Sequence, residues 1–143
     1  MTTDAAARKH ATILLIEDDV TLGGAFAQVL RGAGYEVWLT RTADEGLEKF
    51  KIVRPNAIIV DFRMPLVNGL GFLYRLREAE ADRRTAVTVV TGDTLLGDDV
   101  RSQLHELGAS VRFKPITPNE LLEVVEAMVG DSDTRDTQQR TVW

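Results

Sequence analysis

The short apolar runs of this sequence are followed by polar residues that could take part in chemistry. These residues supply carboxylates, a hydroxyl and an ammonium group: Glu17, Asp18, Asp19, Asp61, Thr91 and Lys114. If the runs are strands of one open parallel sheet, their carboxyl ends lie at a common edge, which is where such sheets bind ligands. We therefore expect side chains from four separate segments to meet at one site.

Carboxylates crowded at one edge repel each other, and a divalent cation removes that repulsion. Mg²⁺ suits such a site because it takes oxygen ligands, retains several waters and uses one or two carboxylates plus a phosphate oxygen. An Asp carboxylate in such a site can also be a nucleophile that forms an aspartyl phosphate. Mg²⁺, Lys114 and Thr91 could then neutralise charge on the phosphoryl oxygens.

Each residue also has a simpler structural interpretation. Asp19 is placed to be the N-cap of a following helix, where Asp is favoured. Asp61 could cap a turn, Thr91 could be an ordinary loop residue and Lys114 could be a surface charge. Their combination at the ends of successive apolar runs is what favours a shared site.

The apolar runs predict five strands of a parallel sheet. They are rich in Ile and Val and mostly continuous, as in strands buried on both faces. The runs comprise residues 12–16, 37–39, 57–60, 86–90 and 111–113. Helical patterns alternate with them, and this alternation predicts an α/β fold: a doubly wound, five-stranded parallel sheet of the (βα)5 type.

The ends of three predicted helices carry recognisable signals. Gly34 is placed to stop the first helix and Gly108 the fourth. The fifth helix has the clearest start, because Thr117 is a candidate N-cap, Pro118 suits the first helical position and Glu120 completes a capping box. These signals indicate where the helices begin and end, and therefore which residues form the loops beside the expected site.

The composition predicts one globular domain, because a chain of 143 residues, 44% of them hydrophobic, can bury about two-thirds of its surface. The net charge of -5 offers no global attraction to nucleic acid or anionic lipid. The absence of cysteine excludes disulfides, thiolate metal sites and a cysteine nucleophile. No apolar run is long enough to span a bilayer and no secretory signal is apparent, so we expect a cytoplasmic protein.

The chain is expected to divide into three parts. Residues 1–11 are predicted to be a flexible N-terminal segment, residues 12–130 the folded domain and residues 131–143 a polar C-terminal tail. The composition changes abruptly after Gly130, because residues 131–140 include no apolar side chain. Trp143, at the end of this tail, is expected to be exposed.

Four motifs, in this order, resemble the receiver domain of bacterial two-component response regulators. They are I-E-D-D at residues 16–19, D-F-R-M-P-L-V-N-G at residues 61–69, V-T-G at residues 90–92 and K-P at residues 114–115. The resemblance extends over residues 12–129. It implies the flavodoxin-like strand order 2-1-3-4-5 and phosphorylation of an aspartate with Mg²⁺ as the cofactor.

The resemblance implies a role for each acidic residue of the first two motifs. Asp61 would be the phosphoacceptor and a ligand of Mg²⁺. Asp18 would bind Mg²⁺ directly, and Glu17 would bind it through water. The main-chain carbonyl of Arg63 would be a further ligand, whereas Asp19 falls outside the acidic pair and keeps its capping role.

The other two motifs would contact the phosphoryl group. Thr91 would be the switch hydroxyl that moves toward the phosphate, and Lys114 would be its ion-pairing partner. Gly92 would contact the phosphate beside Thr91. The resemblance also makes the Lys114–Pro115 peptide bond a candidate for the cis form.

Two further positions are implied to tune the lifetime of the phosphate. Arg63 and Asp93 lie two residues after Asp61 and Thr91, respectively, and should flank the mouth of the site. An Arg and an Asp facing each other could form a bidentate pair across the opening and restrict the attacking water.

The chain departs from the common receiver pattern near the last strand. Receivers commonly carry Tyr or Phe three residues before the lysine, where this chain has Val111, and residues 108–114 are one residue short of the common pattern. The stretches T-G-D-T-L at residues 91–95 and G-A-S-V-R-F-K-P at residues 108–115 are similar to receivers attached to hybrid sensor kinases. An aromatic relay is therefore not expected.

The implied function is a phosphorylatable signalling switch and not an enzyme acting on a separate substrate. It would accept a phosphoryl group from a sensor histidine kinase or a phosphotransfer protein and catalyse only its own phosphorylation and dephosphorylation. Its output would be contact with a downstream protein, which the sequence does not identify, or onward transfer in a phosphorelay. A phosphorylation-linked homodimer is one arrangement this allows. We expect no DNA-binding domain and no nucleic-acid or membrane partner.

Two other classes of protein use related residues. A haloacid-dehalogenase-like phosphatase also uses an Asp nucleophile and Mg²⁺, but it needs a second Asp two residues later, where this chain has Arg63. A flavodoxin-like flavin carrier needs a Ser/Thr/Gly phosphate loop after the first strand, where the acidic residues of this chain would repel the flavin phosphate.

Overall fold

The computed structural model of the chain describes residues 10–140, and it describes side chains as far as Gly130. Most of the N-terminal segment predicted to be flexible (residues 1–11) and Trp143 lie outside this range. Among the residues described, no helix has the length and apolar character needed to cross a membrane.

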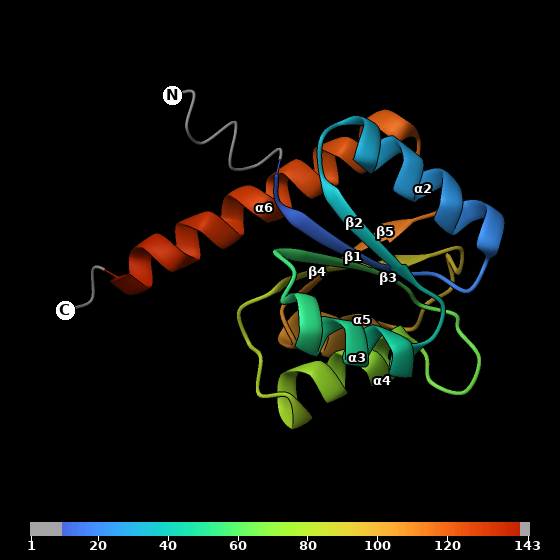
Figure 1. The fold of residues 1–143 in the computed structure, drawn as a ribbon. Helices are drawn as coiled ribbons and strands as arrows, with labels where there is room; N and C mark the ends of the chain where they lie inside the picture. Colours follow the sequence, from blue (N-terminus) through green and yellow to red (C-terminus); the bar gives the residue numbers. More distant parts are fainter. Residues whose placement is uncertain (1–9, 141–143) are drawn as a thin grey trace.

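Five parallel strands form one sheet at the centre of the molecule (Figure 1). They are β1 (Thr12–Ile16), β2 (Glu36–Thr40), β3 (Ala57–Asp61), β4 (Ala86–Thr91) and β5 (Ala109–Phe113). Their order is β2-β1-β3-β4-β5, which confirms the predicted fold class and strand order. Each predicted apolar run lies within one strand, and the strands extend at most two residues beyond it.

Helices cover both faces of the sheet, as Figure 1 shows. On one face lie α2 (Val20–Gly32) and α6 (Pro118–Arg140), and on the other lie α3 (Ala43–Val53), α4 (Gly69–Tyr74) and α5 (Asp98–Glu106). Helix α4 continues directly into a π-helical turn, η1 (Arg75–Ala79), which the sequence pattern did not predict. The order of the strands reverses at β1 and β3, and in folds of this kind the ligand site lies at that point.

Alternate side chains of each central strand enter two separate cores. In β1, Ile13 and Leu15 belong to the core shared with α2 and α6, whereas Leu14 and Ile16 belong to the core shared with α3, α4 and α5. All four side chains are almost completely buried. Burial on both faces explains why the runs are continuously apolar rather than alternating.

Most of the predicted signals at the helix ends are present, but among the described residues the capping box at the start of α6 has only one of its two hydrogen bonds. The side chain of Asp19 accepts a hydrogen bond from the first turn of α2 at 3.0 Å, so Asp19 is its N-cap. The hydroxyl of Thr117 accepts one from the main-chain N–H of Glu120 at 3.1 Å, at the start of α6. Gly34 and Gly108 follow the ends of α2 and α5 with φ values of 99° and 78°, which favour glycine.

Helix α6 extends past Gly130 to Arg140. The backbone of residues 131–140 is therefore helical, although the sequence predicted only a polar tail there. The limits expected for the folded domain, residues 12–130, remain a prediction.

Candidate functional site

The sheet brings the predicted site residues to one edge. Glu17 and Asp18 directly follow β1, and Lys114 directly follows β5. Asp61 is the last residue of β3, and Thr91 is the last residue of β4. Because β1, β3, β4 and β5 are neighbours in this parallel sheet, their carboxyl ends lie side by side.

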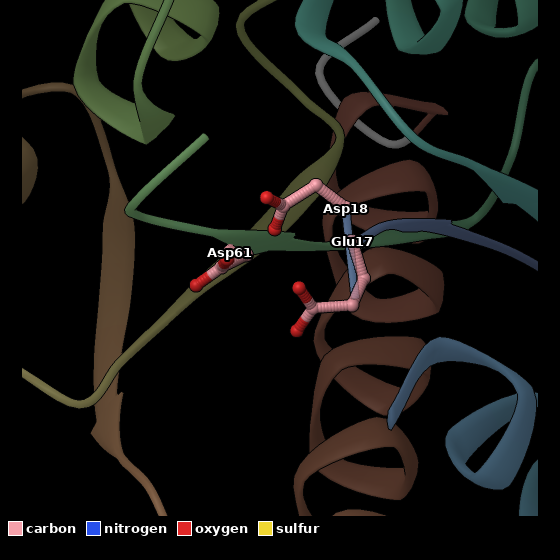
Figure 2. Close-up of side chains that lie close together, drawn as sticks. All are labelled: Glu17, Asp18 and Asp61. Atoms are coloured by element: carbon pink, nitrogen blue, oxygen red, sulfur yellow. The ribbon is translucent and has the colours of Figure 1, made fainter. Parts of the chain in front are cut away.

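Glu17, Asp18 and Asp61 form an acidic cluster, shown in Figure 2. One oxygen from each residue lies within 4.8 Å of the oxygens from the other two. Ligands of a single octahedral Mg²⁺ lie about 3–4 Å apart, and Mg²⁺ prefers oxygen donors. The donor atoms of the cluster are those that Mg²⁺ prefers, and their spacing of up to 4.8 Å is only slightly wider than in a bound site.

Lys114 supplies a positive charge to this cluster. Its Nζ atom lies 3.0 Å from Oε1 of Glu17 and 3.2 Å from Oδ1 of Asp61. Its main-chain N–H donates to the carbonyl of Thr91 at 2.8 Å, which fixes the chain just beyond β5. The sequence placed Lys114 and Glu17, 97 positions apart, at the same site, but it did not predict that these two side chains pair directly.

Burial changes the protonation of the cluster. Glu17 and Asp61 are only 5% and 6% exposed. Burial raises the pKa of Glu17 to about 7, with the hydrogen bond from Lys114 opposing this rise and the charge of Asp61 adding to it. Burial likewise raises the pKa of Asp61 above its ordinary value, against the opposing charge of Lys114. A bound cation would favour the charged form of both carboxyls.

The pKa of the Lys114 ammonium is set by two opposing effects of its surroundings. Burial alone lowers its pKa, but the hydrogen bond to Glu17 and the charge of Asp61 raise it more, so the net pKa lies above the ordinary lysine value. Lys114 therefore stays charged at neutral pH and offsets part of the repulsion between the two carboxylates.

The hydroxyl of Thr91 is engaged with the loop that follows β4. Thr91 is completely buried, and its Oγ1 accepts a hydrogen bond from the main-chain N–H of Asp93 at 3.0 Å. A Cβ atom at Gly92 would meet no atom within 4 Å, so crowding does not explain the glycine at this position.

Arg63 and Asp93 form an ion pair between the loops that follow β3 and β4. Nη2 of Arg63 lies 2.5 Å from Oδ2 of Asp93. The other oxygen of Asp93 accepts a hydrogen bond from the main-chain N–H of Leu95 at 3.0 Å. The hydrogen bond from Arg63 holds the pKa of Asp93 below its ordinary value. The two residues pair through one nitrogen and one oxygen, not in the bidentate arrangement suggested by the sequence. Their effect on phosphate lifetime remains a prediction.

The remaining predicted positions lie close to this site. The Lys114–Pro115 peptide bond is cis, as the resemblance implied. The contact found for Arg63 is made by its side chain, and the role of its main-chain carbonyl as a ligand remains a prediction. Val111 is partly buried against the core that includes α5.

Comparison with known proteins establishes the family. The response regulator receiver domain model matches residues 13–126, so the chain belongs to the response regulator receiver domain family of two-component systems. Members of this family are signalling switches, and phosphorylation and Mg²⁺ binding are general properties of the family.

Individual relatives agree with this assignment. The chain is 27% identical to the polar-differentiation response regulator DivK of Brucella anthropi, over 85% of this chain and 98% of that protein. The CheY-like receiver domain protein of Methanospirillum hungatei superposes with a TM-score of 0.80 at 26% identity, over 88% of this chain and 98% of the other. The chemotaxis response regulator CheY4 of Vibrio cholerae has a TM-score of 0.75 at 26% identity, over 83% and 98%.

Proposed function

We propose that this chain is a phosphorylation switch in which Asp61 accepts a phosphoryl group from the phosphohistidine of a protein donor. The observation that carries this proposal is the cluster of Glu17, Asp18 and Asp61, with Lys114 in contact with two of its carboxylates. An Asp nucleophile beside two acids and an ammonium group is what an aspartyl phosphate requires.

In the proposed reaction, an oxygen of Asp61 attacks phosphorus as the bond between phosphorus and the donor imidazole breaks. Glu17, Asp18 and Asp61 would hold Mg²⁺, together with the carbonyl of Arg63. When bound, the ion supplies positive charge to the phosphoryl oxygens. Lys114 already contacts Oδ1 of Asp61 at 3.2 Å, so a small displacement would let it pair with a phosphoryl oxygen.

The switch itself would begin at Thr91. Its hydroxyl now accepts a hydrogen bond from the N–H of Asp93, and on phosphorylation it would move toward the phosphate and donate to a phosphoryl oxygen. That movement would take the hydroxyl away from the N–H of Asp93, and the loop from Gly92 to the start of α5 would rearrange. Loop and helix together would carry the signal.

The donor we propose is a sensor histidine kinase or a phosphotransfer protein acting in the cytoplasm. The output would be contact with another protein or onward transfer in a phosphorelay. A homodimer that forms only on phosphorylation would be a third form of output, and size-exclusion chromatography of the phosphorylated and unphosphorylated chain distinguishes it from the other two.

Phosphorylation by a small donor tests the proposal. Incubation with acetyl phosphate and Mg²⁺ should add one acid-labile phosphate, detected by intact mass, and Asp61→Asn should abolish it. The matched control is Asp19→Asn, since Asp19 caps α2 and Asn is an equally good N-cap. Labelling that survives Asp61→Asn, or that proceeds in EDTA, would contradict the proposal.

A further inference from the structure

Leu66 and Leu95 are the two most exposed of the large apolar side chains in the described part of the molecule. Their exposed fractions are 101% and 90%. Leu66 lies in the loop between β3 and α4, and Leu95 lies in the loop between β4 and α5. These loops begin at Asp61 and Thr91, so both leucines lie close in sequence to residues of the proposed site.

The backbone at Leu66 is in the left-handed region, with a φ of 70°. A residue with a Cβ atom is strained in that region, whereas glycine avoids the strain and asparagine partly avoids it. Since the side chain is fully exposed, packing within the molecule does not offset that strain. Neither the local backbone nor the core therefore explains a leucine at this position, and such outliers tend to occur at functional sites.

The ion pair between Arg63 and Asp93 connects the two loops that carry these leucines. Arg63 precedes Leu66 by three residues. Asp93 accepts hydrogen bonds from the Arg63 side chain and from the main-chain N–H of Leu95, so it also restrains the second loop. The two apolar side chains are therefore presented by loops that are joined to each other.

The loops that carry the two leucines are among the four loops that border Asp61, together with those after β1 and β5. Its strand, β3, has β1 and β4 as neighbours and helices over both faces, and Asp61 itself is 6% exposed. A phosphoryl donor must therefore approach the carboxyl end of β3, where one loop begins and next to which the other begins at the end of β4 (Figure 1). A large donor would cover the loops, whereas a small donor could reach Asp61 without contact to the leucines.

We propose that Leu66 and Leu95 are contact residues for the protein that donates the phosphoryl group, and that they bind an apolar surface beside its phosphohistidine. The inference rests on the proposed function and adds the chemistry of the donor surface. A fully buried leucine contributes enough binding free energy that its loss should slow transfer at least about 10-fold.

Two donors of different size test this inference. The small donor is phosphoramidate. The protein donor is the autophosphorylated histidine kinase, or the phosphotransfer protein, from the source genome that phosphorylates the wild-type chain fastest. Leu66→Ser and Leu95→Ser should each lower kcat/KM for the protein donor about 10-fold and leave the phosphoramidate rate within about twofold.

Ile52→Ser is the matched control. Ile52 is 73% exposed, and it lies near the end of α3, next to the start of β3 and therefore at the opposite edge of the sheet from Asp61. This substitution should leave both rates unchanged. Leu66→Gly separates binding from folding, because it removes the strain of the left-handed backbone and should raise the unfolding midpoint while slowing protein transfer as the serine variant does.

Each other outcome has a defined meaning. Wild-type rates of transfer from the protein donor in both serine variants would overturn the inference. That result is expected if the leucines bind an output partner instead. Equal slowing with both donors would also overturn it, because the leucines would then shape the site itself. The inference would also be overturned if no histidine kinase or phosphotransfer protein from the source genome phosphorylates the wild-type chain. Failure of phosphoramidate to phosphorylate wild-type Asp61 would instead contradict the proposed function.

Discussion

The side chain of Arg63 crosses from the loop after β3 to Asp93 in the loop after β4, and the two groups meet at 2.5 Å. Arg63 is 71% exposed and Asp93 is 22% exposed. An exposed pair of this kind adds little to stability, because solvent screens it. Its position is more informative than its energy, because it spans the loops on either side of the phosphoacceptor.

We predict that this ion pair prolongs the life of the phosphate by restricting water at the mouth of the site. Arg63→Ala and Asp93→Ala should each speed loss of phosphate from Asp61, measured by intact mass after the donor is removed. If the two residues act as one unit, the double variant should lose phosphate no faster than the quicker single variant. Additive effects would show that they act independently, and unchanged decay in both single variants would show that the ion pair does not restrict the attacking water.

The raised pKa values of the acidic cluster predict how stability depends on pH. Glu17 titrates near pH 7 in the folded protein and near 4.5 in an unfolded chain, so the folded state binds the proton more tightly. The stabilising contribution of this proton is complete below pH 4.5 and is lost as the pH rises to about 7. Glu17→Gln should remove this loss.

Denaturant unfolding at pH 5 and pH 8 tests this prediction. From pH 5 to pH 8, the unfolding free energy of wild type should fall by about 1–3 kcal/mol more than that of Glu17→Gln. Mg²⁺ should stabilise the wild type more at pH 8 than at pH 5, because the ion competes with protons for the same carboxylates. An identical pH dependence in the two proteins would show that Glu17 does not titrate in this way.

Val111 predicts where the protein changes on activation. A β-branched side chain has few rotamers, and Val111 has no ring that could relocate. We therefore expect amide exchange on adding beryllofluoride and Mg²⁺ to change more in the loop after Thr91 and in α5 than in β5. Mass spectrometry of peptides from these segments measures the amide exchange. Larger changes around Val111 than across residues 94–104 would count against the prediction.

Arg77 is expected to contribute to the stability of the fold independently of the phosphorylation site. It is 3% exposed, pairs with Asp82 at 3.2 Å and donates from Nε to the carbonyl of Leu107, just after α5, at 2.9 Å. Arg77→Met should cost about 3 kcal/mol in unfolding free energy, because it leaves the partners of a buried cation unpaired. Phosphorylation by acetyl phosphate should still occur.

The control for that variant is Arg75→Met. Arg75 is two residues away and pairs with Asp44, but both side chains are exposed. Its substitution should cost less than about 1 kcal/mol. Equal losses for the two variants would show that burial of Arg77 does not set its contribution.

The sequence alone determined the class of fold and the edge of the sheet that carries the site. Strands buried on both faces must be continuously apolar, so their positions can be read directly, as with Ile13 to Ile16 in β1. The caps Asp19 and Thr117 act within three residues, so they too could be predicted. Once the strands are parallel, the polar residues that follow them must meet at one edge.

Other features were decided only by the tertiary structure. The pairing of Lys114 with Glu17 depends on strand order and register over 97 residues, and no local pattern records it. The burial of Arg77 and the π-helical turn at residues 75–79 depend on how α4 packs against neighbouring segments. The left-handed backbone of Leu66 is also set by its loop, against the ordinary preference of leucine. Periodicity and helix caps depend on residues close together in the sequence and can be predicted from it. Contacts between distant segments form only when packing brings those segments together.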